Sequence, residues 1–521
     1  MLNAVFTRYE TERGMSALPD SYDPYREGLR LSREGHHSQA IERFEEALRR
    51  EPDDTRVLFA LGNTARTLGL AAPAEEFFRR VLALEPARIE ALVNLANLLR
   101  ANGDPKAAEA LLNPALARAP DAAELWLTLG SAWREMGDPA KAEAHYHEAL
   151  ARRTDYPEAL GNLADLLADR RELDEALALY GRAIKRDGKN AQARLNRAVL
   201  HFLKGDLKEG WRDYEARLAV PGKTPQREHR LPAWTGGPLA KTRLLVMAEQ
   251  GVGDQMMFAS VIPDLAARAA AEGSSIILEC EPRLVTLFAR SFLDVKAMPS
   301  EMESRSGTVT AHYGWLKNIG GANRAVEMGS LPRFLRGDLS RFLAPHAYLV
   351  PDTGETTRWK NWLASQGEGP ATGICWRSGK SGGLRNLQYA PLEEWGRFLR
   401  DVRGRIVCAQ YGAATEEIAE LEKISRRTII VPPGLNQKLE LDRTCALFAA
   451  LDAVVSAPTA VSWLAAGSGV PTYKILYDTS WTAFGSDREP FAPACRVMMP
   501  DTPGCWSGVF AKTLAALNAL P

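Results

Sequence analysis

Ala40-Ile-Glu-Arg-Phe44 decides the fold, because its pattern of a small residue followed four positions later by a bulky one returns every 34 residues. The small residue lies at Ala40, Ala74, Ala108, Ala142, Ala176 and Gly210. The bulky residue lies at Phe44, Phe78, Leu112, Tyr146, Tyr180 and Tyr214. A small side chain lets two helices approach, and a bulky one fills the space between them. The pattern therefore predicts packed helix pairs.

Prolines and glycines recur at fixed phases of the same repeat. Prolines that are expected to end the second helix of a pair stand at Pro52, Pro86 and Pro120. Glycines at the small position of the first helix are Gly28, Gly62 and Gly130. A period of 34 residues is that of tetratricopeptide repeats (TPRs). We expect an α-solenoid of about six TPRs over residues 21–218, with a degraded last copy that carries Arg194 and Arg197 and forms a cap or junction.

The solenoid predicts an interaction with another protein. Stacked helix pairs create a curved array whose concave side suits an extended peptide or a partner helix. The alternative is that the array is an inert spacer or a dimerisation arm.

Composition excludes several classes of protein. The 521 residues include 65 Lys and Arg and 65 Asp and Glu, so no excess positive charge favours nucleic acid or an anionic membrane. The six cysteines form no CxxC pair, and the eight histidines show no ligand spacing, so we expect neither a zinc site nor another metal, and no cofactor. Residues 1–20 lack the apolar core of a signal peptide, and no run of about 18 apolar residues exists, so we expect a cytoplasmic protein without a membrane span.

The second half of the chain alternates short apolar runs with helical patterns. A polar stretch with two prolines begins at Val220 and marks a linker, residues 219–241. The first apolar run is Leu244 to Met247, followed by a glycine turn, a helical pattern from Met256 to Ala271 and a second run from Ser275 to Cys280. Further candidate strands are Thr372 to Trp376, Arg405 to Ala409, Thr428 to Val431, Ala453 to Ser456 and Thr472 to Leu476. Parallel sheets follow from this order, and we expect two Rossmann-like lobes, residues 242–350 and 351–521, after a tail of residues 1–20.

Ligands of open parallel sheets bind at the carboxyl ends of the strands, so the turns after the strands are the candidate sites. In Glu249-Gln-Gly-Val-Gly-Asp254, the loop residues Gln250, Gly251 and Gly253 allow backbone amides to approach a ligand at a helix N-terminus. Asp254 is either a general base facing the cleft or a helix N-cap, and the sequence leaves both open.

Trp376-Arg-Ser-Gly-Lys380 follows the first strand of the second predicted lobe, and Arg385 lies in the glycine-rich loop beyond it. Arg377, Ser378, Lys380 and Arg385 suit a phosphate or diphosphate leaving group, whose developing charge must be stabilised during transfer. The alternative is a solvated basic loop.

Ser456-Ala-Pro-Thr-Ala-Val461 precedes another helical pattern. The amides that follow Thr459, including those of Ala460 and Val461, would aim the positive end of a helix at an anion, although Thr459 also suits a simple N-cap role. Gln410 ends another strand and is a candidate for the border of a nucleotide base or ribose.

The order of four segments resembles bacterial TPR-containing glycosyltransferases over about residues 21–510. These segments are Leu207-Lys-Glu-Gly-Trp-Arg-Asp-Tyr-Glu-Ala-Arg217, Ala248-Glu-Gln-Gly-Val-Gly-Asp254, Ile374-Cys-Trp-Arg-Ser-Gly379 and Ser456-Ala-Pro-Thr-Ala-Val461. The chain also looks distantly like O-linked N-acetylglucosamine transferase and heptosyltransferases. The resemblance implies a metal-independent enzyme of the GT-B fold. Its nucleotide-sugar donor would be held by the second lobe, and its acceptor would reach Asp254, in the place of a catalytic base, from the first lobe and the repeats.

The chain differs from the proteins it resembles at one point, and the resemblance also implies a class of substrate. Many relatives carry a His in the helix after the last segment, whereas this chain has Ser462 and Trp463. The segments are similar to flagellin-modifying TPR-glycosyltransferases, which implies flagellin as acceptor and CMP-linked pseudaminic acid, a nonulosonic acid, as donor. We therefore expect a protein O-glycosyltransferase acting on Ser or Thr. The alternatives are a TPR adaptor with an inactive glycosyltransferase-like domain, and a transferase that acts on a glycan or lipid-linked acceptor.

Overall fold

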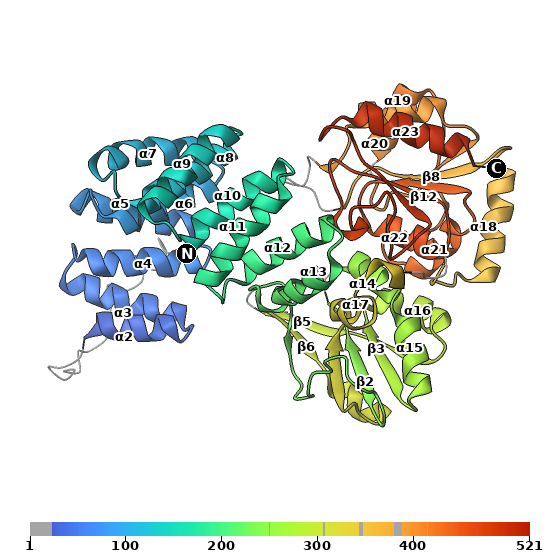
Figure 1. Ribbon diagram of the computed structural model, residues 1–521, viewed down its shortest axis with the longest axis horizontal. Helices are drawn as coiled ribbons and strands as arrows, with labels where there is room; N and C mark the ends of the chain where they lie inside the picture. The colour runs from blue at the N-terminus through green and yellow to red at the C-terminus, as the bar shows by residue number, and fades with distance from the viewer. Residues whose placement is uncertain are drawn as a thin grey trace, which may run out of the picture. The chain divides into compact units, whose positions relative to one another are not determined.

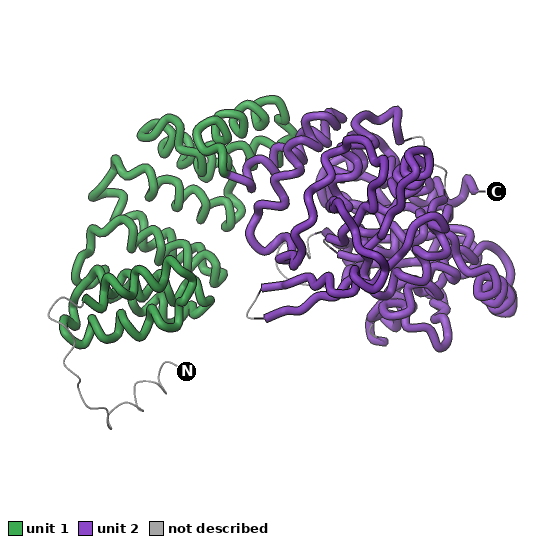
Figure 2. The backbone as a smooth tube through the Cα atoms, turned by 90° about the horizontal axis from the view of Figure 1, so that it is seen from below, with its two compact units in different colours: residues 1–189 green, residues 190–521 purple. Residues whose placement is uncertain are grey.

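The computed structural model describes residues 23–249, 251–305, 308–342, 347–379, 388–413 and 415–520. The backbone forms two compact units, Met1–Lys189 and Asn190–Pro521 (Figures 1 and 2). The first unit is helical, and the second contains every described strand together with the last helices of the repeat-like segment. The sequence analysis divides the chain into a tail, the repeats, a linker and two lobes, and it ends the repeats at residue 218, after the boundary between the two units at residue 189. That division stays a prediction.

The helices of the first unit follow one another in antiparallel pairs. They are α2 (Pro24–Arg33), α3 (His37–Arg50), α4 (Thr55–Thr67), α5 (Ala71–Leu84), α6 (Ile89–Ala101), α7 (Pro105–Arg118), α8 (Ala123–Glu135), α9 (Pro139–Arg152), α10 (Pro157–Asp169) and α11 (Leu173–Arg186). Pro52, Pro86 and Pro120 lie just beyond the ends of α3, α5 and α7, as predicted.

A glycine of the first helix meets the bulky residue of the second helix inside the first two helix pairs. Phe44 and Phe78 are fully buried. A Cβ atom added at Gly28 would lie 2.5 Å from the Phe44 ring, and one at Gly62 would lie 2.7 Å from the Phe78 ring. These contacts are too short for any residue but glycine with the rings in place. The packing predicted from the 34-residue pattern is confirmed.

The turn inside each pair needs a left-handed residue at the same phase. Gly35, Gly69, Gly103 and Gly137 have φ between 73° and 85°, whereas the fifth turn places Arg171 at φ 67°. Glycine adopts this conformation without a steric cost, which explains its recurrence.

The second unit begins with α12 (Ala191–Leu203), α13 (Leu207–Tyr214) and the 3-10 helix η1 (Glu215–Ala219). Arg197, one of the two residues that mark this copy as degraded, is partly buried and pairs with Asp213 of α13, with an Nε to Oδ2 distance of 2.5 Å. An ion pair thus replaces an apolar contact between the two helices.

A parallel sheet of order β4-β3-β2-β7 forms the first lobe of this unit. A smaller sheet, β1-β6-β5, lies beside it, with β5 antiparallel to β6. The elements are β1 (Gln226–Arg227), β2 (Arg243–Met247), α14 (Val252–Ala259), α15 (Ile262–Ala271), β3 (Ser275–Cys280), η2 (Pro282–Leu284), α16 (Val285–Ser291), β4 (Val295–Pro299), β5 (Glu301–Arg305), β6 (Thr308–His312), η3 (Gly314–Ile319), β7 (Arg324–Glu327), η4 (Met328–Ser330), α17 (Leu331–Leu335) and η5 (Leu339–Arg341). The helical pattern expected over Met256 to Ala271 is two helices, because Pro263 starts a new one.

The second lobe contains a parallel sheet of order β10-β9-β8-β11-β12-β13. Its elements are α18 (Thr353–Ser365), β8 (Ala371–Cys375), α19 (Leu392–Asp401), β9 (Arg405–Cys408), α20 (Thr415–Ser425), β10 (Ile429–Ile430), α21 (Leu441–Phe448), β11 (Ala453–Ser456), α22 (Ala460–Gly467), β12 (Thr472–Ile475), η7 (Trp481–Ala483), β13 (Cys495–Met498) and α23 (Trp506–Asn518). All candidate strands of this region are present, and the C-terminal part of the chain is an α/β structure.

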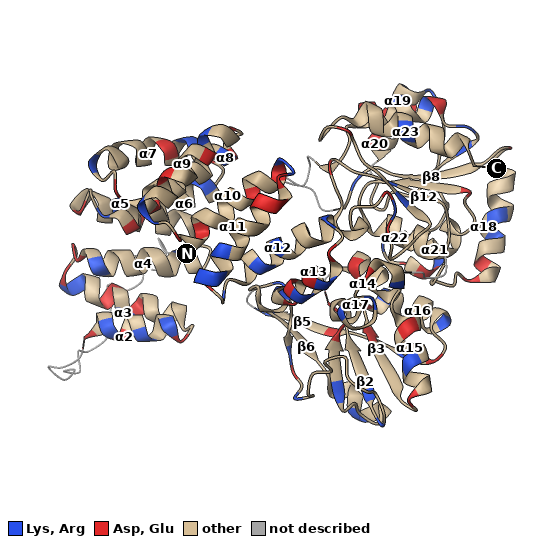
Figure 3. Ribbon diagram, viewed as in Figure 1, with Lys and Arg blue, Asp and Glu red and all other residues tan. Residues whose placement is uncertain are grey.

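Basic and acidic residues are scattered over both units (Figure 3). Within the described residues, no helix combines the length and apolar character that crossing a membrane requires.

Candidate functional site

A cavity of about 600 Å³ lies between the two lobes of the second unit. Its walls come from turns that follow strands: Gly251–Asp254 after β2, Ser378 and Gly379 after β8, Tyr411 after β9 and Pro458–Val461 after β11. Both sheets therefore direct the carboxyl ends of their strands at one cavity, which is the position of ligand sites in open parallel sheets.

Asp254 contributes the carboxylate of the first-lobe wall. It is the third residue of α14, and its Oδ2 accepts the N–H of Gly251, 3.1 Å away, at the start of that helix. Burial raises the pKa of this carboxyl above its ordinary value, the N–H of Gly251 opposes the shift and the negative charge of Glu249 adds to it. Asp254 thus reinforces the helix terminus and lines the cavity as well, although the N-cap position itself belongs to Gly251.

The N-terminus of α22 forms the facing wall. Thr459 is its N-cap, and its Oγ1 accepts the N–H of Val461 at 3.3 Å. A Cβ atom at Gly253 would lie 3.4 Å from the Cα atom of Ala460, so glycine lets the starts of α14 and α22 approach closely. Gly251, Gly253, Asp254, Thr459, Ala460 and Val461, all singled out from the sequence, line one cavity.

The turn after β8 brings one of its predicted residues to the cavity and holds another elsewhere. Ser378 lines the cavity. The Arg377 guanidinium instead pairs with Glu417 of α20 through two contacts of 2.6 Å, from Nε to Oε1 and from Nη2 to Oε2. Arg377 would have to leave this pair to reach a ligand, so its donor-binding role stays a prediction.

Gln410 supports the same turn from inside. It is 3% exposed, and its Oε1 accepts the N–H groups of Trp376 and Arg377, each at 3.0 Å. The amide shapes the backbone after β8 and is not among the residues that line the cavity. Gln250, Lys380 and Arg385 lie outside the described residues.

Two cationic residues in the cavity wall were missed by the sequence interpretation. Arg283 follows β3 in the first lobe, and Lys438 lies between β10 and α21 in the second. The Arg283 Nη1 donates to the carbonyl oxygen of Lys438 at 2.5 Å, which joins the lobes at the cavity. Both residues occupy turns after strands, so a search of every such turn for cations would have found them.

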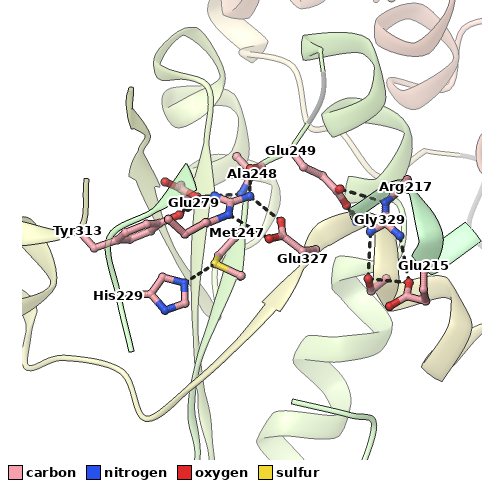
Figure 4. Close-up of polar contacts among 12 residues, drawn as sticks. Glu215, Arg217, His229, Met247, Ala248, Glu249, Glu279, Tyr313, Glu327 and Gly329 are labelled. Carbon is pink, nitrogen blue, oxygen red and sulfur yellow. Dashed lines mark hydrogen bonds and ion pairs between the residues drawn. The ribbon is translucent and has the colours of Figure 1, made fainter. Parts of the chain in front are cut away.

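Two buried glutamates, Glu249 and Glu279, and the partly buried Glu327 lie at the carboxyl ends of the first sheet, against two arginines (Figure 4). Arg217 pairs with Glu249, which follows β2. Arg227 pairs with Glu327 of β7 through Nη2 and Oε2 at 2.5 Å, and with Glu279 of β3 through Nη1 and Oε2 at 3.3 Å. Burial raises the pKa of Glu327 to about 7, although Arg227 opposes this shift.

Glu327 is expected to make stability depend on pH. A carboxyl whose pKa rises from its ordinary 4.5 to about 7 on folding contributes stability that is complete below pH 4.5 and lost as the pH rises to 7. At 1.36 kcal/mol per pKa unit, the loss is on the order of 3 kcal/mol. Unfolding measured at pH 5, 6, 7 and 8 should show this decline in the wild type and a weaker one in Glu327→Gln. The exposed Glu301→Gln is the control, and equal slopes in all three proteins would contradict the expectation.

Metal ligation has no candidate here, because the described part of the chain contains no group of three or more His, Cys, Asp or Glu side chains arranged around an ion.

Comparison with known proteins gives a family match within the repeats and a relative whose match extends beyond them. The tetratricopeptide repeat family matches residues 25–89, 93–157, 134–183 and 162–226. Protein FlbA of Caulobacter vibrioides is 30% identical over 330 residues, which cover 63% of this chain and 55% of FlbA, so the chain spans about half the length of this relative.

Two solved structures give the scale of the structural likeness. A TPR protein of Thermus thermophilus is 31% identical, with 34% of this chain and 96% of that chain covered and a TM-score of 0.31. A TPR protein of Parabacteroides merdae is 18% identical, with coverages of 48% and 89% and a TM-score of 0.32. The family match and the helix pairs together show that the N-terminal part of this chain is a tetratricopeptide repeat solenoid.

Proposed function

We propose that this protein is a glycosyltransferase of the two-lobed GT-B type, which moves a sugar from a nucleotide-sugar donor to a Ser or Thr hydroxyl of a protein recruited by its TPR solenoid. One observation carries the proposal: a carboxylate on the first lobe, Asp254, and a helix N-terminus on the second, Thr459–Val461, face the same cavity at the carboxyl ends of two parallel sheets.

The two walls suit the two halves of the reaction. Asp254 would accept the proton of the acceptor hydroxyl, whose oxygen forms a bond to the anomeric carbon of the sugar. The bond from that carbon to the phosphate oxygen of the donor breaks, and its electron pair leaves with the nucleotide. Backbone N–H groups at the start of α22, together with Lys438 and Arg283, would stabilise the charge on the departing phosphate.

The repeats supply the reason for a protein acceptor, since solenoids of this kind bind other proteins. Flagellin and CMP-pseudaminic acid are the first substrates to test, because the segments quoted above resemble flagellin-modifying enzymes.

A substitution at the start of α22 tests the donor site with the helix left intact. Ala460 is the first residue of α22, where proline is tolerated, and Thr459 before it is extended, with φ −133° and ψ 176°. Ala460→Pro removes one N–H donor, and we expect it to weaken nucleotide binding by about tenfold or more, the cost of one charge-assisted hydrogen bond. Calorimetry with CMP, UDP, GDP and ADP measures this loss.

Ala460→Gly is the control, because it also changes the side chain at this position but keeps the N–H. Its affinity should stay close to that of the wild type. Equal affinities for Ala460→Pro and Ala460→Gly would place the phosphate elsewhere. The absence of binding by the folded wild type would favour the TPR adaptor.

A further inference from the structure

We propose that Arg217, at the end of the repeat-like helices, is a positioning residue for the cavity: through Glu249 it fixes the turn Gly251–Asp254, so that α12, α13 and η1 belong functionally to the candidate site. This inference rests on the proposed function for its consequence in binding, but its structural part is tested without any ligand.

Arg217 is enclosed by contacts. It lies in η1 and is 2% exposed. Its Nε donates to Glu249 Oε2 at 3.0 Å, and its Nη2 donates to Glu249 Oε1 at 2.7 Å and to Ser330 Oγ at 2.9 Å. Its Nη1 donates to the carbonyl oxygen of Tyr214 and to Glu215. A planar guanidinium satisfies all these acceptors at once, which the single ammonium of lysine cannot do.

Glu249, which Arg217 holds in place, connects Arg217 to the turn that lines the cavity. It lies two residues after the end of β2 and precedes the turn that leads into α14, and its side chain is fully buried. Its Oε1 also accepts the N–H of Gly329 at 2.6 Å, which ties β2 to the start of η4 (Figure 4). A Cβ atom at Gly329 would overlap this oxygen, so the site is built around the carboxylate. The chain therefore enters the Gly251–Asp254 turn from a fixed point.

The helices that carry Arg217 pack on both lobes. Tyr214 lies 6.4 Å from Phe258 of α14, measured between ring centroids. Phe202 of α12 stacks on Trp481 of the second lobe at 5.2 Å, and Trp211 of α13 contacts Phe484 edge-on at 5.9 Å. This aromatic contact set holds the segment against the lobes on either side of the cavity, which is the arrangement that a positioning element requires.

Glu249, the partner of Arg217, also affects the pKa of the carboxylate in the cavity. Its negative charge raises the pKa of Asp254. The charges that act on Asp254 include those of Glu249 and Lys474, and Arg283 and Lys438 lie in the same cavity wall. Loss of Arg217 would leave Glu249 without its main counter-charge, so the negative charge of Glu249 would raise the pKa of Asp254 more strongly. Loss of the Glu249 charge would instead lower the pKa of Asp254.

The chain offers a matched control for a purely stabilising ion pair. Arg336 is 1% exposed in the same lobe, and it pairs with Asp264 through Nε and Oδ2 at 2.8 Å and donates to the carbonyl oxygen of Ser260 at 2.7 Å. Its partners thus lie at the C-cap of α14, Ser260, and in α15, at the opposite end of α14 from the Gly251–Asp254 turn. Arg217→Gln and Arg336→Gln therefore each remove a buried guanidinium, although the carboxylate partner of Arg217 is 0% exposed and that of Arg336 is 38% exposed.

Hydrogen–deuterium exchange of the full-length protein without ligand tests the proposal. We expect exchange of peptides covering residues 251–259 to become faster by on the order of tenfold in Arg217→Gln, and to stay near the wild-type rate in Arg336→Gln. Arg217→Lys should give an intermediate rate. Glu249→Gln, which keeps the shape of the side chain, should also loosen residues 251–259, and it provides the test if Arg217→Gln does not fold.

The outcomes separate the positioning role from the proposed function. Unchanged exchange in residues 251–259 for folded Arg217→Gln or Glu249→Gln, or equal changes in Arg336→Gln, would overturn the positioning role. CMP calorimetry on the same proteins supplies the second readout: the affinity should fall in Arg217→Gln and persist in Arg336→Gln. If exchange responds as expected but the wild type binds no nucleotide of the panel, the positioning role stands and the proposed donor site fails.

Discussion

Lys474→Met is expected to lower the free energy of unfolding of the second unit by about 3–5 kcal/mol, because it leaves a buried carboxylate without its counter-charge. Lys474 lies in β12, and its Nζ is 2.6 Å from Oε1 of Glu489. Their side chains are 4% and 0% exposed. Methionine keeps most of the apolar stem and removes only the charged group, so the loss reports on the pair rather than on a cavity.

The surroundings of Glu489 show why its charge would not be compensated. The described partners of its Oε1 other than Lys474 are the hydroxyls of Thr482 at 2.9 Å and Ser480 at 3.3 Å. Its Oε2 is buried and accepts no hydrogen bond from the described residues. Two neutral donors cannot replace an ammonium at this depth, so removal of Lys474 should be costly.

Calorimetric unfolding of three variants measures the effect. Lys512→Met is the control: it breaks an exposed pair with Asp501, whose Nζ to Oδ1 distance is 2.7 Å, and should cost no more than about 1 kcal/mol. Adding Glu489→Gln to Lys474→Met should recover part of the loss, because the unpaired charge is gone. A cost for Lys474→Met as small as that of Lys512→Met would show that the buried pair is not a net stabiliser.

The repeats could be predicted from sequence because the residues that pack each helix pair lie close together in the chain and recur at a fixed period. Ala40 and Phe44 lie one helical turn apart, and the same relation recurs in each copy, so the signal is repeated along the chain. Strands β8 to β12 of the second lobe were found for a related reason, since continuous apolar runs mark strands buried on both faces, whereas β13 was missed. The strands β5 and β6 were missed because most of their side chains are exposed, and their residues lack an apolar run.

The sequence predicted the residues of the candidate site that strand order brings together, but not their side-chain partners. Asp254 and Thr459 meet because each follows a strand of a parallel sheet, which sequence order reveals. The partner of Arg377 is Glu417, and Arg283 donates to the backbone carbonyl oxygen of Lys438 in the other lobe. No spacing rule links such residues, because side-chain contacts between distant segments depend on how the helices pack. The junction motif ending in Arg217 was recognised as a pattern, but its contact with Glu249 required the structure.

Asp254→Asn is expected to reduce transfer of pseudaminic acid from CMP-pseudaminic acid to flagellin by about 10²–10⁴-fold, the usual contribution of a general base. Asparagine retains an oxygen that can accept the N–H of Gly251, now 3.1 Å from Asp254 Oδ2, so the start of α14 should persist. Nucleotide affinity should change little, because the donor amides lie on α22. Mass spectrometry of flagellin measures transfer, and Asp294→Asn, at an exposed position of the first lobe, is the control.

The pH dependence of transfer distinguishes a base from a helix cap. A base acts only when deprotonated, and burial raises the pKa of Asp254 above 3.8, so activity should rise with pH through a value higher than that of an exposed aspartate. Glu249→Gln removes a charge that raises this pKa, and the acid limb of its profile should therefore move to lower pH. If Asp254→Asn transferred sugar at the wild-type rate, the carboxylate would serve the helix terminus alone. The proton would then have to be accepted by another group, because at neutral pH a serine or threonine hydroxyl is too weak a nucleophile to attack without one.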